Sequence, residues 1–220
     1  MAFPTTGILD NFNRSNEGPP PSANWGECFG GIVGEWKVVS NQCVVDSLTN
    51  GIAINYWSAS TFGPDTECHC KIVTKPPDNE GRYIVLFVRG TGHTGDGSNF
   101  DGYEVAFFPA DDDLSMIFRI DNTVGTQLGE TIWQDIENGD SIGIEIIGTS
   151  NNIKAYYKPA SGAWTQMGST QSDGTYTGAG ALLLSTNRAE SVVDDFGGGT
   201  VAAGAALLYK PNIYSHILVR

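Results

Sequence analysis

The two ends of this chain carry matching short segments. LDNFNR occupies residues 9–14 and VDDFGGG occupies residues 193–199. Each reads as an apolar residue, a pair of acidic or amide residues and a phenylalanine, followed by a break. Between them lie only short strand-like runs separated by glycine. The echo predicts an all-β domain closed by pairing of its first and last strands, with Phe12 and Phe196 buried close together.

The residues between these ends alternate as strands do. In the segment 141–147, Ile142, Ile144 and Ile146 share one face. Further runs bounded by Gly, Asn, Asp and Pro are expected to form strands at 36–45, 51–58, 66–74, 83–89, 102–108, 115–121, 152–158, 179–185 and 192–196. No long stretch has the spacing of an amphipathic helix. Many short strands at regular intervals predict an antiparallel sandwich or barrel.

Composition excludes several classes of partner. The chain has 220 residues, a net charge of −13 and 28 glycines. Nucleic acid phosphates and anionic lipid headgroups repel an acidic protein, so neither nucleic acid nor a membrane is an expected partner. The first residues lack the basic and apolar regions of a secretory signal. We expect a protein that is made in the cytoplasm of a host cell.

The segment order resembles concanavalin A-like (laminin G-like) jelly-roll domains of tailed-bacteriophage virion structural proteins. The resemblance covers about residues 8–200. It is carried by the opening DNFNR…GPPPSANW, the central DGYEV, the run SMIFRIDNTVGTQLGETIWQDIENGDSIGIEIIG, the segment IKAYYKP…GAWTQMGST and the closing VDDFGGG. It implies a jelly-roll β-sandwich in which DGYEV forms a strand of the ligand face.

The same resemblance implies two functions. The first is a capsid decoration or cement protein on the outer shell of a virion. Its partners would be the major capsid protein or other virion proteins, and it would form a homo-oligomer, with a trimer favoured. The alternative is a carbohydrate-binding, lectin-like module on a fibre or tail that attaches to a host-surface glycan.

The sequence holds no recognisable catalytic constellation. Sandwich glucanases use carboxylates spaced as Glu-x-Asp-x-x-Glu on one strand, and the nearest segment here is 133–137. Trp133 stands where the first glutamate belongs, so Asp135 and Glu137 are interpreted as an acidic pair beside a turn. No Gly-x-Ser-x-Gly nucleophile elbow occurs either. We expect no enzymatic activity.

Two kinds of ligand remain open. Aromatic rings stack on sugar rings, and the candidates for carbohydrate binding are Trp57, Tyr103 and Trp164. Core packing is the alternative for each ring. Calcium takes oxygen ligands, and pairing of the end strands would bring together Asp10, Asp194 and Asp195. Backbone donors are the alternative partners of these carboxylates, and no other cofactor is expected.

The four cysteines are Cys28, Cys43, Cys68 and Cys70. Neighbouring residues in a strand point to opposite faces, so Cys68, His69 and Cys70 cannot offer three ligands to one metal. The paired CxxC spacing of a zinc site is missing as well. Buried free thiols are expected, with a disulfide between Cys28 and Cys43 as the alternative.

The last residues differ in character from the rest. A spacer of small residues, 200–206, precedes a segment rich in apolar and aromatic side chains: Leu207, Leu208, Tyr209, Ile213, Tyr214, Ile217, Leu218 and Val219. Pro211 interrupts any helix there. We expect a lead at 1–7, a sandwich at 8–199 and an assembly arm at 200–220 that adds to the sheet edge of a neighbour. Folding back onto its own sandwich is the alternative.

Overall fold

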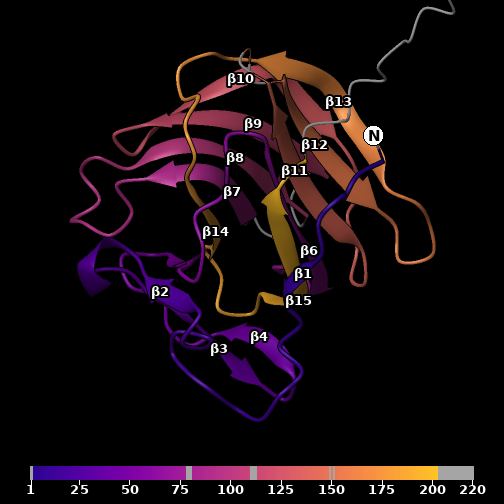
Figure 1. The fold of residues 1–220 in the computed structure, drawn as a ribbon. Coiled ribbons are helices and arrows are strands. Elements are labelled where there is room, and N and C mark those ends of the chain that lie inside the picture. Colours follow the sequence, from indigo (N-terminus) through magenta and orange to yellow (C-terminus); the bar gives the residue numbers. More distant parts are fainter. Residues whose placement is uncertain (1, 78–80, 110–112, 149, 151, 203–220) are drawn as a thin grey trace, which may run out of the picture.

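Two antiparallel sheets packed face to face make up the fold (Figure 1). The computed structural model describes residues 2–77, 81–109, 113–148, 150 and 152–202. The prediction of an all-β antiparallel sandwich is confirmed. In the described residues the helical structure is one 3-10 turn, η1 (Phe29–Gly31), and no helix there is long and apolar enough to cross a membrane.

Sheet A contains both ends of the domain. Its strands, in spatial order, are β13 (Thr165–Ser172), β12 (Asn152–Lys158), β11 (Ser141–Ile147), β6 (Thr66–Thr74), β15 (Val192–Thr200), β4 (Gln42–Val45) and β3 (Trp36–Val39), while β1 (Ile8–Asp10) also pairs with β15.

Sheet B faces sheet A across the core. Its strands, in spatial order, are β10 (Val124–Trp133), β9 (Leu114–Asp121), β8 (Asp101–Phe108), β7 (Ile84–Thr91), β14 (Ala181–Thr186), β5 (Ala53–Trp57) and β2 (Trp25–Glu27). Alternation decides which side chains enter the core. In β11, Ile142, Ile144 and Ile146 are fully buried between the sheets, as the sequence pattern predicts.

The predicted pairing of the two ends is present. Strand β1 runs antiparallel to β15, with Ile8 opposite Gly197 and Asp10 opposite Phe196. Phe12 and Phe196 are both fully buried. Both rings pack on Trp25, at centroid distances of 6.0 Å and 4.7 Å. The end strands therefore close the sandwich around one shared aromatic cluster.

All four cysteines are buried and free, as expected. Cys43, Cys68 and Cys70 lie in the core between the sheets, where burial raises the pKa of each thiol. Cys28 belongs to a second apolar cluster outside sheet B. The four residues act as small apolar side chains, since thiols with raised pKa values are poor nucleophiles and metal ligands.

Two edge strands, β10 and β13, each contain a β-bulge at a glycine. Strand β10 carries TQLGET at 126–131, and β13 carries TQMGST at 165–170. Both glycines have positive φ, +76° at Gly129 and +59° at Gly168, and both strands are bulged there. In β13 the Gln166 side chain donates to the Gly168 carbonyl at 3.2 Å, and β10 repeats this contact. A glycine bulge tied by a glutamine thus shapes both edges.

The predicted domain boundary shifts slightly. Thr200 still belongs to β15, and the Val201 amide donates to the Asp65 carbonyl at 2.8 Å. Val201 is buried. The apolar side chains expected to form the assembly arm, from Leu207 to Val219, lie outside the described residues.

Candidate binding site on the outer face of sheet B

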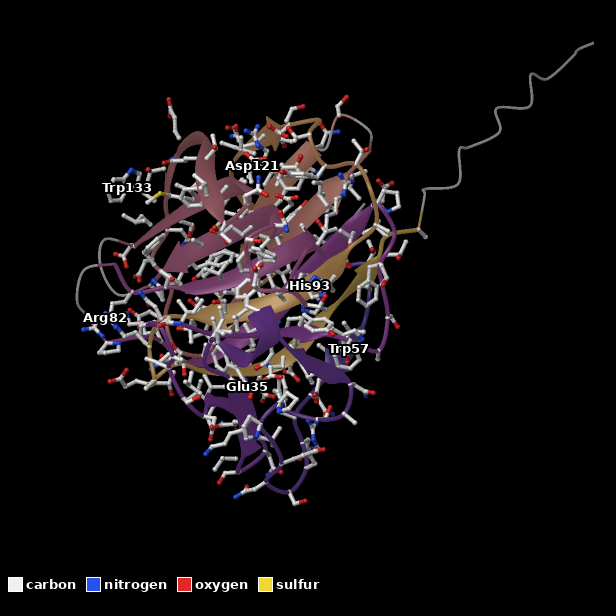
Figure 2. All side chains as sticks on the ribbon, turned by 90° about the vertical axis from the view of Figure 1, so that its left-hand side faces the viewer. Glu35, Trp57, Arg82, His93, Asp121 and Trp133 are labelled. Carbon is white, nitrogen blue, oxygen red and sulfur yellow. The ribbon has the colours of Figure 1, made fainter. Side chains whose placement is uncertain are left out.

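The outer face of sheet B is hollowed and apolar. Figure 2 views the molecule from this side. The alternation that sends Leu86 into the core turns Val85 and Phe87 outward, and β8 and β9 do the same. The hollow has a volume of ≈ 410 Å³, within the range of small-molecule sites. The residues that shape its floor and walls include Ile54, Val85, Phe87, Glu104, Ala106, Phe108, Phe118 and Ile120.

Glu104 is the one carboxyl group among the described residues that line this hollow. Across the neighbouring strands it lies opposite Phe87 on β7 and Phe118 on β9. Burial among these rings raises the pKa of Glu104 to about 8. Its carboxyl group therefore carries a proton at neutral pH and can donate a hydrogen bond. No protein partner for this group occurs among the described residues.

Aromatic rings surround the mouth of the hollow. Tyr83 meets Phe108 edge to face, with ring centroids 5.8 Å apart. Tyr83, Phe108 and Phe118 are half-buried, so part of each ring stays open to a ligand. Burial and the nearby Glu104 raise the pKa of the Tyr83 hydroxyl, which is a second donor at neutral pH. Aromatic faces with a few convergent polar groups are typical of ligand sites.

Two loops close the other end of the hollow. The Phe29 amide of η1 donates to the His93 carbonyl at 2.7 Å, and the Phe29 ring packs on Phe100 at 5.3 Å. Gly97 is required beside them, because it has a φ of +84° and a Cβ there would lie 3.2 Å from the Phe29 ring. The glycine-rich loop at 90–99 thus packs on Phe29, which lines the hollow together with Phe100.

The three aromatic residues predicted to bind carbohydrate are not brought together. Trp57 is buried and packs edge to face on Trp25 at 5.6 Å. Tyr103 is fully buried in the core, and its hydroxyl donates to the Asp173 carboxylate at 2.8 Å. Trp164 is half-buried on the outer face of sheet A. Of the three, only Tyr103 is adjacent in the sequence to a residue that lines the hollow, namely Glu104.

The three aspartates expected to hold calcium are Asp10, near the end of β1, and Asp194 and Asp195 on β15. Asp10 already accepts two hydrogen bonds from Arg14, at 2.6 Å and 3.0 Å, and one from Trp25 Nε1 at 2.9 Å. Within the described part of the chain, no three His, Cys, Asp or Glu side chains are grouped so that they could bind a metal. The Arg14 guanidinium neutralises Asp10, and calcium binding by these aspartates stays a prediction.

The acidic pair at 133–137 lies away from the hollow. Trp133 is 70% exposed at the end of β10 and projects outward (Figure 2). Asp135 and Glu137 are exposed, and Glu137 pairs with Lys75 at 2.8 Å. Hydrolysis of a glycosidic bond needs two carboxyl groups flanking it, and the lining residues described here supply Glu104 alone.

Comparisons with known proteins show the fold. No family model matches this sequence, and no curated protein matches it. The carbohydrate-binding module CBM66 from Bacillus subtilis is 16% identical, with a TM-score of 0.54 over 79% of this chain and 91% of that chain. The Ca2+/Man2-bound exoplasmic/lumenal domain of VIP36 is 12% identical, with a TM-score of 0.59 over 91% of this chain and 90% of that chain.

An enzyme shares the same architecture. A Bacillus licheniformis β-glucanase is 15% identical, with a TM-score of 0.52 over 90% of this chain and 99% of that chain. The chain therefore has the concanavalin A-like β-sandwich fold, which carries both binding modules and hydrolases. None of these three structures is a virion protein.

Proposed function

We propose that this chain is a non-enzymatic, lectin-like carbohydrate-binding module that holds a sugar in the hollow of sheet B. One observation carries the proposal: Glu104 lines this hollow between Phe87 and Phe118 on the neighbouring strands, and burial raises the pKa of its carboxyl group to about 8. Sugar rings have apolar faces that stack on aromatics and hydroxyl groups that accept hydrogen bonds. Phe118 and Phe108 would supply the stacking faces, and Glu104 the donor.

Two proteins of similar structure support a carbohydrate-binding function. CBM66 is a carbohydrate-binding module, and VIP36 was captured with Man2. The β-glucanase points to hydrolysis instead, but a hydrolase needs a second carboxyl group across the sugar from the first. In the described lining only Glu104 is acidic, and its raised pKa suits it to donate a hydrogen bond rather than to act as a nucleophile.

Calorimetric titration with neutral oligosaccharides built from mannose, glucose and galactose tests the proposal. One of them should bind saturably without being cleaved. Phe118→Ala and Glu104→Ala should each weaken that binding about 5- to 20-fold, the cost of one aromatic contact or one buried hydrogen bond. Glu137→Gln removes an exposed carboxylate elsewhere and should leave binding unchanged.

Two outcomes would overturn the proposal. One is the absence of saturable binding for every glycan while an apolar ligand such as a fatty acid binds. The other is release of reducing sugar that stops when Glu104 is changed. The role on a virion, its capsid partners, the trimer and the localisation on a particle rest on the sequence resemblance alone and stay predictions.

A further inference from the structure

The outer face of sheet A is built from three rows of side chains. Strands β6, β11 and β12 pair in register, so outward residues align across them. The three rows are Glu67–Glu145–Lys154, His69–Gly143–Tyr156 and Lys71–Ser141–Lys158. The first, with two glutamates, is called the acidic row, and the third, with a lysine at each end, is called the basic row. Adjacent rows are two residues apart along each strand, so all nine side chains share one face.

The N-terminal residues cover two of these rows. The Phe3 ring stacks on Tyr156 at 3.9 Å, in the space left by Gly143, where a Cβ would lie 2.4 Å from that ring. The backbone and hydroxyl of Thr6 donate to Glu67 at 2.5 Å and 2.7 Å. In the same row Glu145 pairs with Lys154 at 2.8 Å. In this row Lys154 thus neutralises Glu145, whereas one oxygen of Glu67 accepts hydrogen bonds from Thr6 and the other has no partner among the described residues.

The basic row stays open. It borders a hollow of ≈ 460 Å³, which lies between the N-terminal residues and the loop that carries Trp164. Lys71, Ser141 and Lys158 are half-buried in it. Neither lysine forms an ion pair with any carboxylate in the described part of the chain, whereas Lys37, Lys75 and Lys154 all do. Two unpaired ammonium groups in one hollow are notable in a protein of net charge −13.

The surroundings of the lysines define the ligand further. Asp195 also lines the hollow and Asp194 lies opposite Lys71, so part of the positive charge is offset at the β15 side. His69 lines the hollow but adds no charge, because burial lowers its pKa to about 4. Trp164, held edge-on by Phe3 at 4.9 Å, offers an aromatic surface beside the lysines. Two lysines beside an aromatic ring match a ring-shaped, hydroxylated ligand that carries one anionic group.

We propose that this second hollow binds an acidic sugar, with its carboxylate between Lys71 and Lys158 and its ring beside Trp164. Neighbouring strands are about 4.8 Å apart, so the two lysine Cα atoms are separated by about 10 Å with Ser141 midway. Long side chains from both sides can then reach one carboxylate, while the Ser141 hydroxyl lies beneath it. This site is separate from the hollow of sheet B, since the two lie on opposite outer faces of the sandwich.

Titration of the intact chain with galacturonate and glucuronate, followed by NMR at low ionic strength, tests the site. Both uronates should shift the signals of Lys71, Lys158 and Trp164 saturably, and galactose and glucose should not shift them. Lys71→Gln, Lys158→Gln and Trp164→Ala should each weaken uronate binding about tenfold, and added salt should weaken it in the unmodified protein. Lys37→Gln removes the same charge from a distant ion pair and should have no effect. Glu104→Ala should also have no effect, so this site can fail or succeed independently of the one on sheet B.

Three results would overturn the proposal. The first is an equal shift of the Lys71, Lys158 and Trp164 signals by galactose and by galacturonate, which would make charge irrelevant at this hollow. The second is a loss of uronate binding in Lys37→Gln as large as that in Lys71→Gln, which would mark a general effect of net charge. The third is inorganic phosphate binding as tightly as the uronates with no effect of Trp164→Ala, which would leave an anion site without a sugar.

Discussion

Glu104 lies directly opposite Phe118 across the ladder between β8 and β9. This apolar neighbour, with Phe87 on the other side, is why the carboxyl group holds its proton so firmly. A carboxyl group whose pKa is raised in the folded state destabilises that state once it ionises. The free energy of unfolding should therefore fall as pH rises from about 4.5, near the unfolded value, to about 8, and then level off.

The variant Glu104→Gln isolates this effect. An amide cannot ionise, so the variant should match the unmodified protein at pH 4 and exceed its stability by about 1–3 kcal/mol at pH 9, a value discounted for the partial exposure of the side chain. Urea unfolding at several pH values measures the difference. Glu137→Gln, at an exposed site, should show no such divergence. A constant gap between the curves for Glu104→Gln and the unmodified protein would contradict a raised pKa.

Closure of the sandwich by its end strands predicts a large cost for either buried phenylalanine. Phe12→Ala and Phe196→Ala should each lower the free energy of unfolding by about 3–5 kcal/mol, because each leaves a cavity against Trp25. Chemical denaturation gives the value. Ile8→Ala on β1, four residues before Phe12, is the control, since Ile8 is 49% exposed, and it should cost far less. Similar losses at positions 8 and 12 would mean that the shared cluster is not what closes the domain.

Gly97 packs against Phe29, which lines the sheet B hollow. Gly97→Ala should destabilise the protein by about 1–2 kcal/mol, because alanine is strained at a φ of +84° and its methyl group would press on Phe29. It should also weaken ligand binding in that hollow. Gly95→Ala is the control in the same loop, because a Cβ there would meet only the Gly92 carbonyl oxygen, at 3.9 Å, and it should behave like the unmodified protein. Thermal unfolding and calorimetry report the two effects separately.

The C-terminal boundary can be tested by two truncations. A chain that ends after Ala202 keeps every described contact of β15 and should retain its thermal transition. A chain that ends after Gly199 loses Val201 and the bond from the Gly63 amide to the Thr200 hydroxyl, and should melt at a lower temperature. If the segment after Ala202 is an assembly arm, the chain that ends after Ala202 should no longer form any oligomer that light scattering detects for the full chain. An unchanged oligomer would remove that role.

The fold and the pairing of its two ends could be predicted from the sequence, because the alternation of apolar residues and the two phenylalanine motifs show which side chains are buried. It did not reveal strands β10 and β13. Their outward positions carry Thr, Gln and Gly, and a bulge breaks the period of two in each strand. Pattern recognition fails where the register itself shifts.

The site was harder to predict than the fold. Tyr103 was selected for its ring, yet alternation turns it into the core and turns Glu104 into the hollow. A usable signal was the unbroken apolar run at 84–88, because a strand with one solvated face alternates and this one does not. Apolar residues on both faces of β7 indicate that its outer side is covered as well, and Val85 and Phe87 are buried there in the second apolar cluster. Which rings meet there depends on pairings between distant strands, which a single sequence does not encode locally.

The matched glycine bulges limit how this domain can meet other chains. Strands β10 and β13 turn toward each other at their bulges, where Gly168 faces Ile132 and Gly129 faces Gln171. At the opposite side, Glu17 exchanges two backbone hydrogen bonds with Val38 and caps the edge of β3. These edges offer few free backbone groups to an incoming strand. A strand that adds to this domain would therefore meet a bulged edge at β10 and β13 and an occupied edge at β3, which limits uncontrolled growth into fibres.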